Sequence, residues 1–171
     1  MDKALYVGRF QPFHLGHLDA IKQILKKEKY LIIAIGSGQY SFEKENPFTA
    51  SERYQMIEKA LLEAKIPPKS YTIIPMLNVD NYDIWANYVE MILPPYKNVY
   101  SGSKIVQTLY KNQSKHPVKT VKFNKKIHST LIRKNISENK KWSQMVPKSV
   151  YEFIKNIDGE TRIREIYNTK N

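Results

Sequence analysis

Two histidines three residues apart are the side chains of this sequence best suited to chemistry. His14 and His17 follow a polar turn that also carries Arg9. Imidazole donates hydrogen bonds and gains a proton near neutral pH, which suits a phosphoryl oxygen whose negative charge grows during a reaction. Arg9 adds a fixed charge and a planar fork that matches a phosphate group. The cluster predicts phosphate binding, whereas a bare H-x-x-H pair also fits an ordinary turn with surface histidines.

The residues on either side of this turn indicate how the histidines are positioned. An apolar run over residues 4–7 ends at Gly8, and apolar residues then return at helical spacing, at Leu18, Ile21, Ile24 and Leu25. This pattern predicts a strand, a turn and a helix. Gly8 and Gly16 allow a close approach of the backbone that a side chain would block. The free N–H groups at the start of the helix favour an anion, and a start near His14 places both imidazoles on one helix face.

The same alternation of strand and helix continues along the chain. Apolar or alternating runs predict strands at residues 4–7, 29–36, 71–75, 98–102 and 119–123. Because strands that alternate with helices form parallel sheets, we predict an α/β fold with a parallel sheet of five to six strands and helices on both faces. We expect one domain, residues 1–171, on which residues 143–171 pack as a C-terminal helical segment. In that segment Gly159 is expected to end a helix, and residues 161–171 are expected to form a short basic tail or one to two further helical turns.

Composition limits the classes of function. The chain has 171 residues, and its 28 Lys+Arg against 16 Asp+Glu give a net charge of +12. This balance favours anionic partners, although lysines scattered along amphipathic helices also fit a solvated surface. The absence of cysteine excludes disulfides, thiolate metal sites and thiol nucleophiles. With no apolar run that would span a bilayer and no secretory pattern at its start, we expect a cytoplasmic protein without a membrane partner.

Other segments offer groups that can complete a phosphate or nucleotide site. Residues 36–37 and Gly102 follow expected strands, where parallel sheets bind ligands, and they either admit a substrate or form plain turns. The indole of Trp85 either stacks on a planar ring or packs in the core. Residues 129–133 (STLIR) begin a basic helix, which forms either a second phosphate cradle or an ordinary helix start.

The segment GRFQPFHLGH resembles the G-x-F-x-P-x-H-x-G-H signature of the nucleotidyltransferase superfamily, and every fixed position of that signature is present. The segment STLIR is similar to the second signature of the superfamily. Further segments, in order along nearly the whole chain, resemble the archaeal-type nicotinamide-mononucleotide adenylyltransferases: IAIGSGQ, ENPFTASER, IWANYVEM, PPYKNVYSG and VPKSVYEFI. The resemblance implies a Rossmann-like nucleotidyltransferase fold. It also implies an enzyme that couples ATP to nicotinamide mononucleotide, giving NAD and pyrophosphate.

The same resemblance assigns roles to individual residues. It implies catalytic contacts with the ATP phosphates for His14, His17 and Arg133. It implies an ATP-binding set made of Gly8, Arg9, Phe10, Gly16, Gly102, Ser129 and Thr130. It implies an acceptor-binding set made of Gly36, Ser37, Asn46, Thr49 and Trp85. The chain departs from the family pattern at Tyr82, Asp83 and His128.

The resemblance further implies Mg²⁺ carried by the substrate, without a metal ligand from the protein, and a homo-oligomer, often a hexamer. Two kinds of alternative remain open. The same chemistry would also serve another acceptor, such as pantetheine phosphate, flavin mononucleotide or a substrate of CTP-dependent cytidylyl transfer. A chain with a charge of +12 also fits a nucleic-acid-binding module, but the sequence carries no RNA-binding signature, so we expect no nucleic-acid partner.

Overall fold

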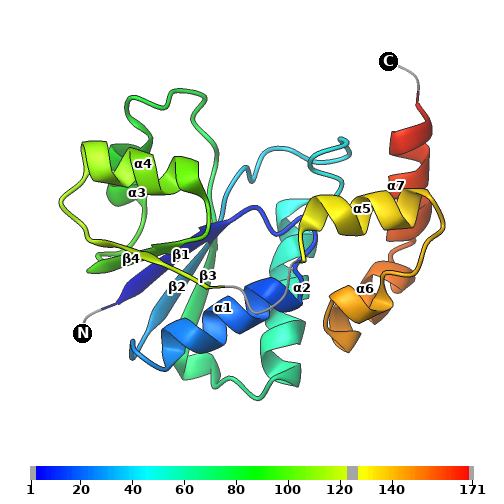
Figure 1. Ribbon diagram of the computed structural model, residues 1–171, viewed down its shortest axis with the longest axis horizontal. Coiled ribbons are helices and arrows are strands. Elements are labelled where there is room, and N and C mark those ends of the chain that lie inside the picture. The colour runs from blue at the N-terminus through cyan, green and yellow to red at the C-terminus, as the bar shows by residue number, and fades with distance from the viewer. Residues whose placement is uncertain (1–2, 123–126, 170–171) are drawn as a thin grey trace.

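Five parallel strands form a sheet in the computed structural model, which describes residues 3–122 and 127–169 (Figure 1). Their order is β3-β2-β1-β4-β5, and their bounds are Ala4–Gly8 for β1, Leu31–Ile35 for β2, Tyr71–Pro75 for β3, Asn98–Ser101 for β4 and Val118–Thr120 for β5. The predicted α/β fold with a parallel sheet is confirmed. The fifth strand ends at Thr120, earlier than expected, and Phe123 of its predicted range lies outside the described residues.

Strand β1 lies at the centre of the sheet, where the order of the strands reverses. Tyr6 of β1 lies opposite Ile33 of β2 on one side and opposite Tyr100 of β4 on the other. The chain adds β2 and β3 on the first side and then crosses over to add β4 and β5 on the second. Open parallel sheets bind ligands at the carboxyl ends of the strands beside such a reversal. The histidine-bearing turn follows the carboxyl end of β1, so it lies where a ligand is expected.

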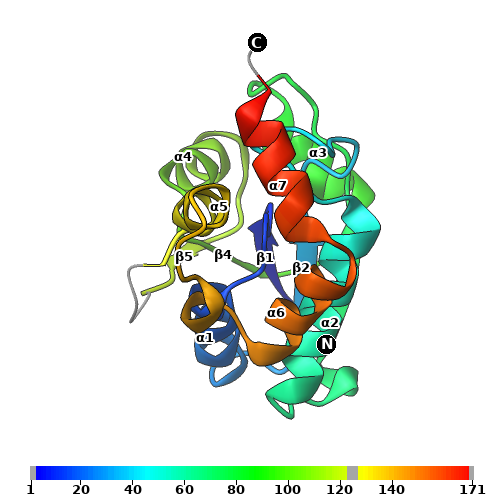
Figure 2. The ribbon, with the colours of Figure 1, turned by 90° about the vertical axis from the view of Figure 1, so that its right-hand side faces the viewer.

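Alternate side chains of the strands face two layers of helices. Helices α1 (Leu15–Leu25) and α2 (Ala50–Glu63) cover one face of the sheet, and α3 (Trp85–Ile92) and α4 (Lys104–Gln113) cover the other (Figure 2). Tyr6 packs with residues of α1 and α2, whereas its neighbours Leu5 and Val7 pack with residues of α3 and α4. Burial on both faces explains why β2 is a continuous apolar run rather than an alternating one.

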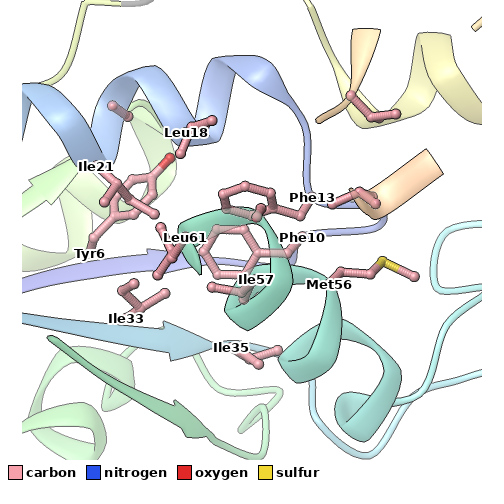
Figure 3. Packing of buried hydrophobic residues seen from close by; sticks show 14 of the residues in the cluster. Tyr6, Phe10, Phe13, Leu18, Ile21, Ile33, Ile35, Met56, Ile57 and Leu61 are labelled. Carbon is pink, nitrogen blue, oxygen red and sulfur yellow. The ribbon is translucent and has the colours of Figure 1, made fainter. Parts of the chain in front are cut away.

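Two phenylalanines fix the turn between β1 and α1. Figure 3 shows Phe10 and Phe13 inserted among side chains of α1 and α2, and both residues are buried. The centroid of the Phe10 ring lies 5.9 Å from that of Phe13 and 4.8 Å from that of His17. Full burial of such a ring contributes about 1.5–3 kcal/mol. The turn that carries the histidines is therefore part of the hydrophobic core.

Three more helices follow the sheet: α5 (Ser129–Ser137), α6 (Lys148–Asn156) and α7 (Gly159–Asn168); short 3-10 turns occupy Pro68–Ser70 and Ser143–Met145. Helix α6 packs against α2, and α7 packs against α5 and α6 (Figure 1). Arg162 of α7 pairs with both carboxylate oxygens of Glu52 in α2, at 2.7 and 2.9 Å. None of the described helices is long and apolar enough to cross a bilayer.

The prediction that Gly159 ends a helix is wrong, whereas the helical turns expected after it are present as part of α7. Gly159 is the first residue of α7, a helix of 10 residues, and the left-handed residue between α6 and α7 is Asp158, with φ of 53°. Close packing requires the glycine instead. A Cβ atom at Gly159 would lie 2.9 Å from the ring of Phe48 and 3.0 Å from Ile154. Helix α7 thus begins in close contact with the segment that leads into α2.

Candidate active site

Helix α1 begins with a cap made by two histidines. The Nδ1 atom of His14 accepts the backbone N–H of His17 at 3.3 Å, and the Nδ1 atom of His17 accepts the backbone N–H of His14 at 3.2 Å. The two rings are stacked, with centroids 3.5 Å apart and an angle of 21° between their planes. Because each Nδ1 is an acceptor, each neutral ring carries its proton on Nε2. The cap therefore leaves two Nε2–H donors side by side.

Burial keeps these rings uncharged in the ligand-free protein. Burial, with a smaller effect from His128, lowers the pKa of His14 to about 3. Burial, with a smaller effect from His14, also lowers the pKa of His17 well below its ordinary value. The expectation that these imidazoles gain a proton near neutral pH is therefore corrected. They are neutral hydrogen-bond donors, and the positive charge of the site comes from arginines.

Both histidines line a cavity of about 430 Å³ between the carboxyl ends of β1 and β4 and the start of α5, which we call the ATP cavity after the ligand predicted from the sequence. Its lining contains these residues predicted for catalysis or ATP binding: Gly8, Arg9, Phe10, His14, His17, Gly102, Ser129, Thr130 and Arg133. Gly16 is not among the lining residues and is buried inside α1. The hydroxyl of Ser129 donates to the carbonyl of Pro12 at 3.1 Å, which ties the start of α5 to the histidine-bearing turn.

Arg133 is buried in the wall of this cavity, with 1% of its surface exposed. Its Nη1 donates to the carbonyl of Gln11 at 2.9 Å, and its Nη2 contacts the Glu45 carboxylate at 3.0 Å and the Thr130 hydroxyl at 3.5 Å. Its Nε is buried and has no hydrogen-bond partner among the described residues. An unpaired buried donor of a charged group is costly, and an entering phosphate oxygen would satisfy it.

A second cavity of about 590 Å³ adjoins the first, and we call it the acceptor cavity after the ligand predicted from the sequence. The two cavities share Val7, Gly8, Arg9 and Ser103 as lining residues. Four residues of the predicted acceptor set line the second cavity, namely Gly36, Ser37, Asn46 and Trp85. Thr49 lines neither cavity: its hydroxyl accepts the backbone N–H of Glu52 at 3.1 Å and caps α2. The structure therefore places Thr49 outside both cavities, at the start of α2.

Trp85 packs in the core and also lines the acceptor cavity. Its side chain is buried and meets the ring of Tyr110 edge to face, with centroids 6.0 Å apart, so it belongs to the core under α3 and α4. The same side chain lines the acceptor cavity, where an indole surface suits a planar ring. Two departures from the family pattern also line cavities, Tyr82 the acceptor cavity and His128 the ATP cavity.

Arg53 is a site residue that the sequence interpretation missed. This buried guanidinium donates to the carbonyls of Arg9 at 2.9 Å, Gly36 at 2.8 Å, Ser37 at 3.0 Å and Thr49 at 3.2 Å. It thereby joins three segments that surround the two cavities. Burial, with a smaller effect from Arg9, lowers its pKa to about 10, so it stays charged at neutral pH. The sequence did contain one indication of this role. Arg53 stands three residues before Met56 and therefore lies, as a charged residue, on the apolar face of the predicted helix.

Gln11 is a second missed residue. Its buried side-chain amide donates to the carbonyl of Phe48 at 2.8 Å, and its amide oxygen accepts the N–H of Phe48 at 3.0 Å. Its backbone carbonyl accepts from Arg133. Gln11 thus connects the histidine-bearing turn to the segment before α2 and to α5. Gln11 occupies a variable position of the signature, so the sequence did not predict this contact.

Two imidazole donors and a buried guanidinium beside the reversal point of a parallel sheet suit the binding of an anionic nucleotide. The chain belongs to the cytidylyltransferase-like family, whose model matches residues 5–135. The relatives then indicate the branch. The chain is 42% identical over 170 residues to the nicotinamide-nucleotide adenylyltransferase of Saccharolobus solfataricus, with 99% of each chain covered. It is also 42% identical over 169 residues to the protein of that name from Archaeoglobus fulgidus, covering 96% of this chain and 97% of the relative.

A solved structure agrees with the fold and with the branch. The bifunctional NMN adenylyltransferase/ADP ribose pyrophosphatase from Francisella tularensis, complexed with AMP and a manganese ion, superposes with a TM-score of 0.77 at 25% identity. The match covers 96% of this chain and 51% of that chain, so this chain spans about half of the bifunctional protein. The resemblance predicted from the sequence is confirmed at the level of the superfamily and of the branch.

Proposed function

We propose that the protein is a nicotinamide-nucleotide adenylyltransferase, which joins ATP to nicotinamide mononucleotide and releases NAD and pyrophosphate. One observation carries the proposal. Two stacked imidazoles, each with its Nε2–H outside the cap, and the buried guanidinium of Arg133 line one cavity, and that cavity adjoins a second one with Trp85 among its lining residues. The names of the relatives support the choice of acceptor.

The reaction is a direct in-line displacement. A phosphate oxygen of nicotinamide mononucleotide attacks the α phosphorus of ATP, and the bond from that phosphorus to the oxygen bridging to the β phosphorus breaks, so that pyrophosphate leaves. The attacking phosphate is already anionic and needs no protein base. The protein contributes positioning and stabilisation of the charge that develops on the transferred phosphoryl group.

The residues of the ATP cavity divide this work. The Nε2–H groups of His14 and His17 donate to triphosphate oxygens, and they are held in place before the substrate arrives. Arg133 and Thr130 at the start of α5 bind the distal phosphates. Arg9 lies in the wall shared by the two cavities, where it contacts the phosphates of both substrates.

The acceptor cavity provides complementary groups for nicotinamide mononucleotide. Trp85 offers an apolar ring surface for the nicotinamide. The side-chain oxygen of Asn46 is buried without a hydrogen-bond partner among the described residues, so it is available to an amide or hydroxyl donor of the acceptor. Gly36 and Ser37 bring backbone close to the same cavity, with Arg53 holding their carbonyls.

A divalent metal enters with the triphosphate in this proposal. The described residues contain no group of three or more His, Asp or Glu side chains that would hold a metal ion. Cationic and backbone donors line the ATP cavity, and these fit an ion held by phosphate oxygens and water, as Mg²⁺ prefers. When bound, the ion would neutralise charge on the triphosphate.

We further propose that residues 1–171 form one domain, on which the C-terminal helices pack. We also propose that the protein is a homo-oligomer. Light scattering would measure the size of the oligomer.

The test is to incubate the purified chain with ATP, MgCl₂ and nicotinamide mononucleotide and to follow NAD and pyrophosphate. Parallel reactions replace the acceptor by pantetheine phosphate or flavin mononucleotide, or ATP by CTP. We expect NAD to form with a kcat/KM at least tenfold above that of any other pair. Pyrophosphate release that is faster with another acceptor, or absent with all of them, would contradict the proposal.

A further inference from the structure

Glu45 lies between the two arginines of the ATP cavity. Its Oε2 atom is 3.0 Å from Nη2 of Arg133 and 3.7 Å from Nη2 of Arg9. The side chain of Glu45 is 56% exposed, whereas that of Arg133 is 1% exposed. A solvent-facing carboxylate therefore supplies the counter-charge of a buried guanidinium, at the place proposed for the distal phosphates.

The hydrogen bonds of Arg133 show why this carboxylate competes with a phosphate. Its Nη1 donates to the carbonyl of Gln11, its Nη2 contacts Glu45 and, at 3.5 Å, the hydroxyl of Thr130, and only Nε lacks a partner among the described residues. Carboxylate and phosphate use the same guanidinium fork. A phosphate group that binds both Nε and Nη2 therefore competes with the carboxylate of Glu45.

The backbone around Glu45 presents this side chain on a short turn with fixed ends. Glu43 and Asn46 exchange backbone hydrogen bonds, at 3.0 and 3.2 Å, so that Lys44 and Glu45 form the tip. Phe48, two residues after Asn46, is held by the amide of Gln11. The exposed side chain of Glu45 can thus leave Arg133 by rotation, while the segment that carries it stays in place.

We propose that Glu45 is a further determinant of substrate affinity in this site: an internal anion that neutralises Arg133 and Arg9 in the ligand-free protein and that the triphosphate must displace. This rests on the proposed function only in naming ATP as the source of the triphosphate. Glu45 weakens triphosphate binding. When no triphosphate is bound, it supplies the counter-charge of the buried guanidinium of Arg133.

The test compares E45Q with E43Q. Both substitutions remove one negative charge from the same turn with little change of shape, but Glu43 forms no ion pair with the described residues. The affinity of each full-length variant for inorganic tripolyphosphate is measured by isothermal titration calorimetry. Because Glu45 is largely exposed, its ion pairs have the strength of surface pairs. We therefore expect E45Q to lower the dissociation constant by about two- to fivefold and E43Q to leave it within about 1.5-fold of wild type.

An unchanged or weaker affinity of E45Q, an equal gain in both variants, or no binding of tripolyphosphate by the wild-type chain would overturn the inference. NAD formation is assayed separately with the same proteins. If nicotinamide mononucleotide is not turned over while E45Q still binds tripolyphosphate more tightly, the proposed acceptor is wrong and the role of Glu45 stands. The two proposals therefore fail in different measurements.

Discussion

The Nδ1 atoms of His14 and His17 each accept the backbone N–H of the other residue. An ordinary helix cap uses a short oxygen-bearing side chain, whereas this cap uses two imidazoles whose second nitrogens remain free for a ligand. The interaction that starts α1 is thus the one that fixes the tautomer and the direction of the donors. The same two hydrogen bonds therefore cap the helix and orient the donors of the site.

His17→Ala tests this arrangement. The substitution removes one Nε2–H donor and one acceptor of the cap, so we expect kcat to fall at least about tenfold, and up to about a hundredfold. We expect the free energy of unfolding to fall by about 1 kcal/mol through loss of the cap. Steady-state kinetics and urea denaturation measure the two effects. His116→Ala removes an imidazole that packs on Tyr96 and lines neither substrate cavity, and it should leave kcat unchanged. Near-normal turnover of His17→Ala would refute the role.

The buried histidines also predict how stability depends on pH. The pKa of His14 is about 3 in the folded protein and about 6.5 in an unfolded chain. Between these two pKa values the unfolded state binds more protons than the folded state. The contribution of His14 to the free energy of unfolding is therefore fully present above about pH 6.5 and is lost as the pH falls below that value. The carboxylates with lowered pKa, such as that of Glu52, lose their contribution only below about pH 4.5. The interval from pH 5 to 6.5 therefore reports on the histidines.

Urea denaturation across that interval measures the slope. We expect each buried histidine to contribute up to about 1.4 kcal/mol per pH unit. His14→Asn keeps a side chain that can cap α1 but removes one titrating group, so its slope should be smaller than that of the wild type. Equal slopes for the two proteins would mean that His14 is not kept neutral by burial.

Arg53 carries the connection between the two cavities, and Arg53→Met tests it. The variant removes this donor from the carbonyls of Arg9, Gly36 and Ser37, whereas the carbonyl of Thr49 still accepts the backbone N–H of residue 53. Each buried unpaired acceptor costs about 1–3 kcal/mol before relaxation and water entry, so we expect a loss of at least about 3 kcal/mol in the free energy of unfolding. Lys59→Met removes an exposed cation from the same helix and should cost less than about 1 kcal/mol. Similar denaturation midpoints for the two variants would contradict the role of Arg53.

The sequence predicted the elements well because their signals are local. The continuous apolar run of β2 fits its burial on both faces, and the three-residue spacing of Thr49 and Glu52 is typical of the capping box that they form. Contacts between distant segments left no such signal. Arg53 reaches Arg9, 44 residues away, and this pairing depends on how the segments meet in the fold. The role of Gly159 was predicted wrongly because a glycine after a helix commonly stops it, while here it begins α7 and leaves room for the ring of Phe48.

Trp85 is predicted to act on the acceptor alone. It lines the acceptor cavity and not the ATP cavity, and its other contacts belong to the core beneath α3 and α4. Trp85→Leu keeps apolar volume and removes the ring surface, whose stacking is worth about 0.5–1.5 kcal/mol. We expect the KM for nicotinamide mononucleotide to rise about two- to tenfold and the KM for ATP to stay within about twofold.

Trp142→Leu is the matched control for this change. Trp142 is also buried, but it packs on Tyr151 and donates to Glu160, in the C-terminal part of the chain. That variant should lose stability and keep both KM values, because neither cavity contains the ring. A rise in the KM for ATP in Trp85→Leu, or an equal rise in the KM for nicotinamide mononucleotide in both variants, would show that the indole acts through the fold. A rise confined to the acceptor in Trp85→Leu would place the nicotinamide against this ring.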